Sequence, residues 1–403
     1  MDSARPAVIL HVLDDLGPGG AERQLIAFVL RADRGRFRHE VCVLATAGPF
    51  AAEMEAAGIR VHVLGLETGR DLVRPFRGLM RVVREINPEI LHATLYRPGV
   101  VSRVVGRLTR TPVVTSLVNT TYEPEWYQDN PRLVPWKVWL TRMVDAATAR
   151  WWGTRFVAIT QAVKVSAVRQ LGLSPDAVAV IPRGVAFEGA DRNGDADRDV
   201  TRAALQWSDA DPLILNVARL VPQKGQQYAV MAMTDVVRAF PRAHLVIVGE
   251  GWLRPTLASM IRDRGLEAHV TLLGERQDIG ALLHAADFFV FPSIYEGLGN
   301  ALLEAMAAGK PCVVSRIPPL REVTGDGAVA LLAEPRSAAD LAANLLRLAA
   351  DPGLAVRLGT AARAWARDRY DIRRSVEAWE SVYETLASQR AMGVGKRSEV
   401  AAR

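Results

Sequence analysis

The sequence predicts an α/β protein of two domains, each built on a parallel β-sheet. The chain has 403 residues, enough for about two domains with separate cores. Short apolar runs of strand length alternate with segments of helix length along most of it. A polar, acidic stretch at 187–200 interrupts this alternation near the middle. Such alternation is typical of parallel strands joined by crossover helices, and the polar break predicts a domain boundary.

Seven apolar runs predict the strands of the first domain. They are Ala7–Leu13, Glu40–Ala45, Val61–Leu64, Ile90–Ala93, Pro112–Leu117, Phe156–Ile159 and Val178–Ile181. Ligands of such sheets bind beyond the carboxyl ends of the strands. The polar residues at those ends are therefore candidates for ligand contacts, namely Asp15, His92, Thr94, Ser116, Asn119 and Thr160.

A glycine-rich turn follows the first strand. Residues 17–20 read Gly-Pro-Gly-Gly and precede a helical stretch, Ala21–Leu30. Glycine lets the backbone approach a phosphate closely, because no Cβ intrudes. The same residues also make an ordinary tight turn, and their spacing is not that of a dinucleotide or P-loop fingerprint. The turn alone leaves both interpretations open.

The second domain repeats the pattern with strands at Leu213–Val217, His244–Val248, Val270–Leu273, Phe288–Phe291 and Cys312–Val314. In its first unit, Arg219 and Lys224 follow a strand end and precede a helix. Two cations there can neutralise a diphosphate leaving group, and in many enzymes stabilisation of developing charge contributes more to catalysis than any other effect. Only 5 of the 50 basic residues are lysines, so a lysine at this position indicates that a compact ammonium group is required.

The most informative stretch is 287–315, which reads as strand, loop, helix and strand. Its loop residues Gly297, Leu298, Gly299 and Asn300 sit where backbone amides at a helix N-terminus can bind an anion. Two carboxylates bracket the loop, Glu296 before it and Glu304 inside the helix. Acidic residues near a helix start are also favoured by the helix dipole alone.

This stretch, PSIYEGLGNALLEAMAAGKPCVVS, resembles the E-x7-E segment of retaining glycosyltransferases of the GT-B fold, above all glycosyltransferase family 4. The resemblance implies two Rossmann-like domains that face each other across a cleft, with a C-terminal helix that crosses back to the first domain. It also implies that domain closure accompanies donor binding.

The resemblance assigns roles to residues of both domains. Glu296 would contact the donor sugar and Glu304 the ribose, while Arg219 and Lys224 match an R-x4-K pair that holds the donor diphosphate. Other positions expected near the donor are Gly19, Gly20, Gly249, Arg276 and the amides of residues 297–300. The family needs no metal and no cofactor, so neither is expected here.

Two positions depart from the family pattern. Family members often carry a histidine at the end of the fourth strand, here His92, and another after the fifth strand, where this chain has Val118. A lone histidine is more often structural than catalytic, but His92, Asn119 and Tyr122 are the acceptor-side candidates. In the turn after the seventh strand, Arg183 replaces the usual asparagine.

Residues 122–152 are aromatic and basic, with Trp126, Tyr127, Trp136, Trp139, Trp151 and Trp152 interspersed with Arg132, Lys137, Arg142 and Arg150. We expect a packing helix with an aromatic wall toward the acceptor. The alternative is a helix that contacts an anionic membrane surface, with tryptophan at the headgroup level.

Composition narrows the class of protein. The charge of +6 lies in the first half, since residues 1–185 hold 24 Lys and Arg against 17 Asp and Glu. This basic half suits a phosphate-bearing acceptor or an anionic membrane, and no nucleic-acid motif is found. No apolar run is long enough for a membrane span, and the start of the chain does not read as a secretory signal. Cys42 and Cys312 lie in apolar runs, which predicts buried reduced thiols and a cytoplasmic protein.

The expected domains are 1–186, joined by a returning helix at 373–390, then a linker at 187–206 and a second domain at 207–372, with a disordered tail at 391–403. The expected activity is transfer of a sugar with retention, from a nucleoside diphosphate sugar, UDP-sugars being favoured, to a glycan, lipid-linked or small-molecule acceptor. Two alternatives stay open. One is a non-catalytic nucleotide-sugar-binding protein of the same fold, and the other is a nucleotide-sugar epimerase.

Overall fold

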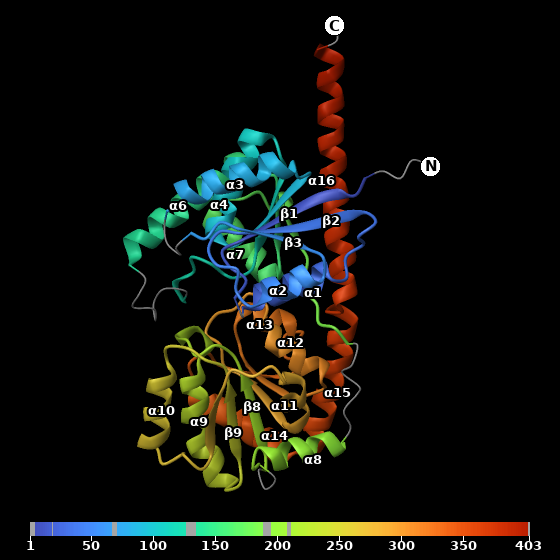
Figure 1. Cartoon of the computed structure of the whole chain (residues 1–403). Coiled ribbons are helices and arrows are strands. Elements are labelled where there is room, and N and C mark those ends of the chain that lie inside the picture. The colour runs from blue at the N-terminus through green and yellow to red at the C-terminus, as the bar shows by residue number, and fades with distance from the viewer. Residues whose placement is uncertain are drawn as a thin grey trace. The chain divides into compact units, whose positions relative to one another are not determined.

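The computed structural model describes residues 5–17, 19–66, 71–125, 134–187, 195–207 and 211–401, the side chains of 195–197 and 391–401 excepted (Figure 1). The chain divides into two compact units. Unit 1 runs to Arg183, apart from a short piece after Glu123, and resumes at Ile372. Most of unit 2 is residues 184–371. The boundaries that the sequence predicts, 186 and 373, fall close to these.

Unit 1 is built on a seven-stranded parallel sheet with the order β3-β2-β1-β4-β5-β6-β7. Because β1 is followed along the chain by β2 on one side and is paired with β4 on the other, the strand order reverses between β1 and β4. The strands are β1 (Ala7–Leu13), β2 (Phe37–Val43), β3 (Arg60–Val63), β4 (Ile90–Thr94), β5 (Val113–Leu117), β6 (Arg155–Ala158) and β7 (Val178–Val180).

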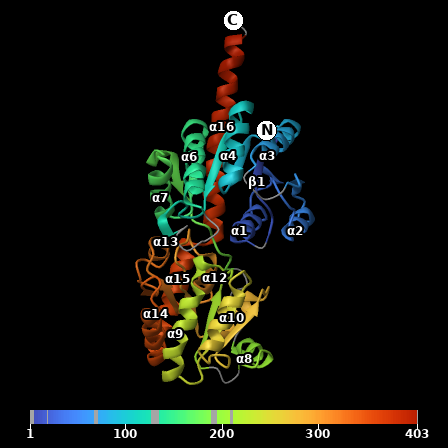
Figure 2. The same ribbon diagram turned by 90° about the vertical axis from the view of Figure 1, so that its left-hand side faces the viewer.

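The helices of unit 1 connect these strands. They are α1 (Gly20–Val29), α2 (Phe50–Ala56), α3 (Val73–Ile86), α4 (Tyr96–Thr109), α6 (Pro135–Trp152), α7 (Gln161–Leu171), a 3-10 turn η1 (Pro175–Ala177), and α16 (Ile372–Ala401). Figure 2 shows α6 beside α4 and α7. One face of the sheet packs on α3 and α4 through a buried aliphatic cluster that includes Leu10, Val12, Leu79 and Val101.

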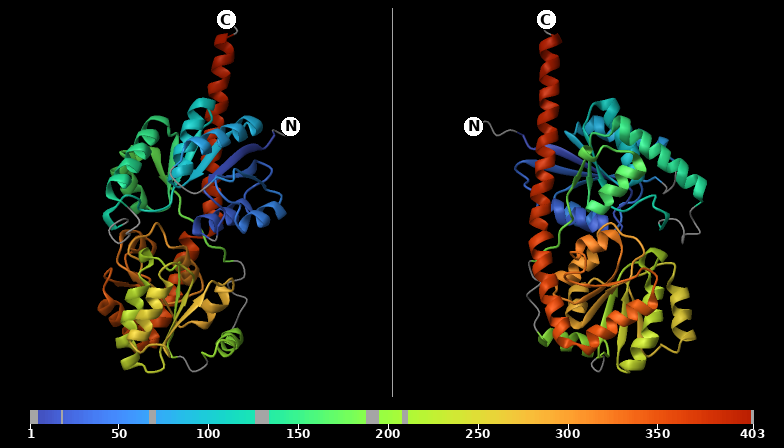
Figure 3. Two further views of the ribbon diagram at one scale, coloured as in Figure 1. Left: turned by 60° about the vertical axis from the view of Figure 1, so that its left-hand side comes forward. Right: turned by 180° about the vertical axis from the view of Figure 1, so that it is seen from behind.

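The other face of this sheet carries three buried histidines. Because side chains alternate along a strand, His11 points away from Leu10 and Val12, and it pairs in register with His92 of β4. His39 of β2 completes the group, with its Nδ1 2.9 Å from His11 Nε2. Helix α16, red in Figures 1 and 3, covers this face and belongs to unit 1 as the returning helix was predicted to do.

Unit 2 is built on a six-stranded parallel sheet with the order β10-β9-β8-β11-β12-β13. Here the strand order reverses between β8 and β11. The strands are β8 (Leu213–Val217), β9 (His244–Val248), β10 (Val270–Gly274), β11 (Phe288–Phe291), β12 (Cys312–Ser315) and β13 (Leu331–Ala333).

The helices of unit 2 are α8 (Asp195–Ala204), a 3-10 turn η2 (Pro222–Lys224), α9 (Gln226–Ala239), α10 (Arg254–Asp263), α11 (Ile279–Ala285), α12 (Asn300–Ala307), α13 (Pro318–Val323), α14 (Ala338–Ala350) and α15 (Pro352–Arg369). A buried aliphatic core joins α9 and α14 to the sheet.

The predicted linker, 187–206, differs from the structure in its second half. Residues 188–194 lie outside the described part, but α8 is a helix of unit 2 that packs on α11. Arg198 and Arg202, four residues apart, both bind the carboxylate of Asp287, at 2.6 Å and 2.8 Å. The polar residues that suggest a linker in the sequence therefore include the two arginines that bind Asp287.

The C-terminal end also differs from the expectation of a disordered tail from 391, because α16 continues to Ala401. Once a helix is nucleated, each further residue adds a backbone hydrogen bond at little cost, so the packed part of α16 can propagate beyond the core.

Both cysteines are buried and free, as predicted. Burial raises the pKa of the Cys42 thiol to about 12 and raises that of Cys312 as well. Within the described ranges, none of the helices combines the length and apolar character needed to cross a bilayer.

Candidate active site

The loops that follow β8 and β11 meet at the carboxyl edge of the sheet of unit 2. Ile294 donates its backbone N–H to the carbonyl of Gln223 at 2.8 Å. The Gln223 side chain in turn donates to the carbonyl of Tyr295 at 2.9 Å. Below the loops, the Asn216 amide donates to the Val290 carbonyl at 2.8 Å and so ties β8 to β11. These loops lie where the strand order reverses, the usual ligand site of an open parallel sheet.

This junction brings Lys224 and Glu296 into contact. The ammonium group of Lys224 donates to Glu296 Oε1 and lies 5.6 Å from the centre of the Phe291 ring. The two side chains are 15% and 7% exposed. The sequence assigns them separate ligand contacts, and the structure places them as one ion pair at the edge of the sheet.

Glycines allow the loops to come this close. Gly225 has φ +64°, and a Cβ there would lie 2.0 Å from the Pro292 carbonyl oxygen. Gly249, a predicted donor-side residue after β9, has φ +132°, and its Cβ would lie 2.1 Å from the Ala218 carbonyl oxygen. Any larger residue at either position must shift the backbone. Gly225 was not predicted from the sequence as a site residue, although its position next to Lys224 could have indicated that role.

The predicted anion site is the N-terminus of α12. Gly297, Leu298 and Gly299 are buried and lead directly into Asn300, the first residue of the helix. The Leu298 side chain is core, so only its backbone is available to a ligand. Glu304 is half-buried and lies one turn beyond Asn300, which puts both side chains on one face of α12.

The two remaining donor-side candidates of unit 2 lie nearer the surface. The exposed Arg219 side chain makes no ion pair within the described residues, while its carbonyl accepts from the Gln226 side chain at 3.0 Å. Arg276 is half-buried and forms a two-point contact with Asp278, at 2.8 Å and 2.6 Å. This contact lowers the pKa of Asp278 and occupies the guanidinium that the sequence assigns to the nucleobase.

In unit 1, Gly19 is the N-cap of α1 and Gly20 its first residue, while Pro18 lies outside the described residues. A Cβ on Gly19 would lie 2.0 Å from Glu22 Oε2, so the Glu22 carboxylate folds back over this turn. The carbonyl of Gly20 accepts from the Arg183 guanidinium at 3.4 Å. Arg183, a departure from the family pattern, therefore contacts the predicted glycine turn.

His92 does not open onto a ligand site, because it lies in the core of unit 1. Its Nδ1 is 2.6 Å from the Tyr383 hydroxyl, its Nε2 is 2.7 Å from Ser116 Oγ, and its ring stacks on Trp379. Burial, together with His39 and Arg183, lowers its pKa to about 3. The buried position of His92 indicates a structural role and gives no support to the prediction that His92 contacts the acceptor.

Tyr122 is likewise a core side chain, 6% exposed. Its hydroxyl donates to Asp145 Oδ2 at 2.9 Å, and Asp145 also accepts from Arg103 at 2.5 Å. Burial and the nearby carboxylate raise the pKa of Tyr122 well above its usual value. Of the three acceptor-side candidates, only Asn119 is on a half-buried loop, where its side chain accepts from the Thr120 amide at 2.9 Å.

Asp14 was not singled out by the sequence and occupies the switch point of unit 1. It follows β1, and its carboxylate lies 3.5 Å from the guanidinium of Arg97 in the first turn of α4. Burial raises its pKa to about 6, against the opposing effect of Arg97. Its Oδ1 makes no hydrogen bond within the described residues. The signal that could have found it is its place after the first strand.

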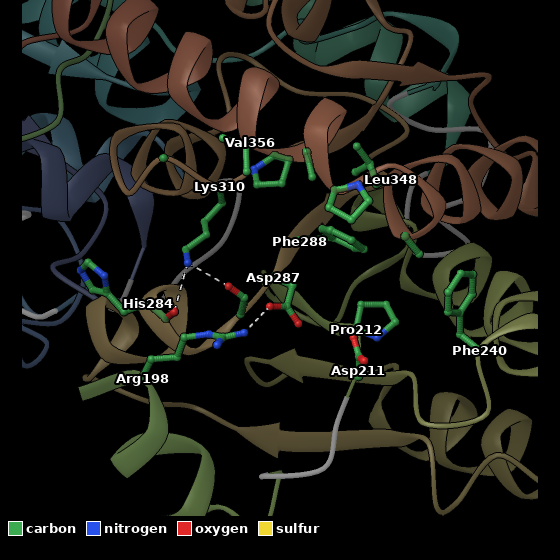
Figure 4. Close-up of a pocket in the computed structure, with 16 residues that line it drawn as sticks. Arg198, Asp211, Pro212, Phe240, His284, Asp287, Phe288, Lys310, Leu348 and Val356 are labelled. Atoms are coloured by element: carbon green, nitrogen blue, oxygen red, sulfur yellow. Dashed lines mark hydrogen bonds and ion pairs between the residues drawn. The ribbon is translucent and has the colours of Figure 1, made fainter. Parts of the chain in front are cut away.

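A cavity of about 500 Å³ lies at the opposite edge of unit 2, at the amino ends of β8, β11 and β12 (Figure 4). Its charged groups are engaged: Arg198 binds Asp287, and Lys310 donates to the carbonyls of His284 and Ala286. The cavity lies between packed elements, at the opposite end of the strands from the Lys224–Glu296 pair.

Two family models match the chain. The model described as Glycosyltransferase Family 4 matches residues 18–188, and the one described as Glycosyl transferases group 1 matches 197–365. Together the two matches span most of the chain, which therefore resembles the GT-B glycosyltransferases of family 4. The predicted resemblance and fold class are thereby confirmed.

Curated relatives of these glycosyltransferases match over part of their length. UDP-Gal:alpha-D-GlcNAc-diphosphoundecaprenol alpha-1,3-galactosyltransferase of Escherichia coli is 30% identical over 59% of this chain and 60% of its own. Alpha-D-kanosaminyltransferase of Streptomyces kanamyceticus is 28% identical over 50% of this chain and 54% of its own. The chain thus spans little more than half the length of these relatives.

Solved structures share the fold. Anabaena Alr3699/HepE in complex with UDP and glucose superimposes with a TM-score of 0.81 at 24% identity, over 95% of this chain and 100% of that one. WaaG, a glycosyltransferase involved in lipopolysaccharide biosynthesis, gives 0.75 at 16% identity, over 93% and 99%.

Proposed function

We propose that this protein is a retaining, metal-independent glycosyltransferase. It transfers a sugar from a nucleoside diphosphate sugar, with UDP-sugars favoured, to a hydroxyl of a glycan, a lipid-linked molecule or a small molecule. The observation that carries the proposal is the contact of Lys224 with Glu296 at the switch point of unit 2. A cation beside a carboxylate suits a ligand that is anionic at one end and rich in hydroxyls at the other, as a sugar diphosphate is.

The chemistry follows from where charge develops. As the bond between the sugar and the diphosphate breaks, negative charge grows on the leaving oxygen. In this proposal Lys224, together with the exposed Arg219 on the same loop, stabilises that charge. Glu296 accepts hydrogen bonds from sugar hydroxyls and orients the ring, and its contact with Lys224 fixes both side chains in advance. Preorganised charges of this kind need no rearrangement during the reaction.

The N-terminus of α12 supplies the remaining donor contacts. The backbone amides of its first turn and the helix dipole favour a phosphate. Glu304, one turn further on, accepts hydrogen bonds from the ribose hydroxyls. Gly249 completes the donor side in unit 2, and Arg276 contacts the nucleobase once its contact with Asp278 is broken.

Several relatives support this choice of donor, and together they leave the acceptor broad. One is named for UDP-galactose and a diphosphoundecaprenol-linked GlcNAc, another for 2-deoxystreptamine, and a structural neighbour was solved with UDP-glucose. Retention and a cytoplasmic location rest on the family resemblance and the sequence. Among the described residues, no group of three or more His, Cys, Asp or Glu is arranged to hold a metal ion. Metal independence stays a proposal.

The proposal is tested by thermal unfolding with UDP-, GDP-, dTDP- and ADP-sugars. A ligand that binds only the folded state stabilises it by about 2.7 kcal/mol at a hundred times its dissociation constant, which raises the melting temperature by about 5–10 °C. One nucleotide class should stabilise the wild type. Glu304→Ala should lose most of that shift because the ribose contact is gone.

Glu267→Ala is the matched control, since Glu267 is an exposed carboxylate in the same unit. It should keep the full shift. If none of the four sugars stabilises the wild type, the donor site proposed here is wrong. A shift without any release of nucleotide would instead favour a non-catalytic binding protein, and release of an epimerised donor would favour an epimerase.

A further inference from the structure

Helix α6 presents an apolar stripe to solvent. Trp136, Trp139, Leu140 and Met143 are 62%, 57%, 49% and 45% exposed. Their spacing of three, four and seven residues puts them on one face of the helix. The residues that α6 buries, among them Val138, Asp145 and Ala149, lie on the opposite side. The sequence predicts a packing helix with an aromatic wall toward the acceptor; α6 does pack on α4 and α7, and these two tryptophans lie on its solvent side.

More aromatic surface continues at the end of the helix. Trp151 and Trp152 are 74% and 37% exposed. By contrast, Trp207 and Trp379, which pack against other elements of the chain, are 6% and 8% exposed. Large apolar side chains gathered in this way on the exposed face of a helix mark a surface that a membrane or another molecule covers. Trp126, Tyr127 and Arg132 lie outside the described residues.

Cations accompany the stripe. Lys137 Nζ lies 5.5 Å from the centre of the Trp136 ring, and Arg142 and Arg150 follow along α6. Both arginines bind neutral groups, the Gln170 side chain at 3.2 Å and the Leu171 carbonyl at 3.0 Å, so they keep their net charge. The single acidic residue of α6 is Asp145, which is buried against Arg103. The charges that accompany the stripe along α6 are therefore positive.

The helix is held firmly by its own unit. Arg103 of α4 binds Asp145, and Arg142 and Arg150 contact the end of α7. The stripe is thus displayed on a folded support, and one end of α6 extends outward from unit 1 in Figures 1 and 3. No folding on binding is needed to present it.

We propose that this face of α6 docks unit 1 on an anionic lipid bilayer. Tryptophan prefers the headgroup region of a membrane, and lysine and arginine beside it are attracted to anionic lipid. A second copy of the chain would bring the same positive charge against this face, which disfavours it as the occupant. The inference goes beyond the proposed function and does not depend on it, because it concerns unit 1 and needs no donor.

The test is co-sedimentation of the full chain with vesicles of phosphatidylcholine alone and of phosphatidylcholine mixed with phosphatidylglycerol. The wild type should sediment with the mixed vesicles, weakly with the neutral ones, and less as salt is added. Trp136→Ala with Trp139→Ala should lower the partition coefficient about tenfold or more, because two interfacial rings are removed. Lys137→Ala should lower it about fivefold.

Trp252→Ala is the matched control, since Trp252 is 40% exposed but lies in unit 2, and it should bind as the wild type does. If the double variant melts early, Lys137→Glu tests the same face. Equal binding to both vesicle types, or full binding by the α6 variants, would overturn the proposal. So would a wild-type dimer that the double variant abolishes. Donor-induced stabilisation should survive in all of these variants, which separates this test from that of the proposed function.

Discussion

At the scale of single residues, the Lys224–Glu296 pair carries the chemistry. A pair this buried loses most of the hydration of both ions, and the attraction between them roughly offsets that loss. It therefore adds little to stability. Its value lies in presenting a fixed cation and a fixed carboxylate at the edge where β8 and β11 end.

Tyr122→Phe tests whether Tyr122 is structural. The substitution removes the O–H donor to Asp145 and leaves a buried carboxylate oxygen without that partner. We expect a loss of about 1–3 kcal/mol in the free energy of unfolding, measured by urea denaturation. Binding of the donor should not change. If the variant is as stable as the wild type but transfers sugar poorly, Tyr122 contacts the acceptor and is not merely structural.

Residues such as His92 and Tyr122 show where sequence reasoning stops. A strand alternates its two faces, so the position of His92 near a strand end does not say which face it occupies. The side chains that bury it come from α16, almost three hundred residues later. Contacts of that separation cannot be read from a local pattern. The motif residues Lys224 and Glu296 were predictable because they lie on loops whose place follows from the strands.

At the scale of elements, the histidine group under α16 makes unit 1 sensitive to acid. Burial, the largest cause, lowers the pKa of His11 well below its usual value and that of His39 to about 4, with Arg34 adding to the effect on His39. With the pKa of His92 at about 3, all three are neutral in the folded unit across most of the acidic range.

We expect the stability of unit 1 to fall as pH drops. The unfolded chain protonates these imidazoles near pH 6.5, whereas the folded unit does not. Their stabilising effect is therefore complete above about pH 6.5 and is lost toward pH 4, at about 1.4 kcal/mol per pH unit for each histidine. The free energy of unfolding, measured with urea at several pH values in this range, should fall less steeply with decreasing pH in His39→Gln than in the wild type. Identical slopes would contradict this expectation.

Elements were predictable where the pattern is strong. The strands of both sheets follow from their apolar runs, except β13, whose three residues Leu331–Ala333 carry no β-branched side chain and lie among helices. Helix α8 was missed because its composition is that of a linker, and the groups that its arginines bind, Asp287 and the Ala285 carbonyl, lie more than eighty residues further along the chain. For α6 the composition was noticed but its exposure was not predictable, since Trp is usually buried.

At the scale of the whole molecule, both units reverse their strand order once, at β1–β4 and at β8–β11. In unit 2 the reversal coincides with Lys224, Glu296 and the start of α12. In unit 1 it coincides with Asp14, Arg97 and the glycine turn. This repeated topology follows from the alternation of strands and helices, and so the fold class could be predicted from the sequence. The acceptor side could not, because its side chains are set by packing against α16 and α6.

The measurement that tests the central claim most directly is release of the nucleoside diphosphate from the stabilising donor, in EDTA and without acceptor. We predict slow release by the wild type and at least about tenfold less by Lys224→Ala, because the leaving group loses its cation. Lys164→Ala, a lysine of unit 1 on α7, should behave as the wild type. Near-normal release by folded Lys224→Ala, or strict dependence on added Mg²⁺ or Mn²⁺, would contradict the proposed mechanism.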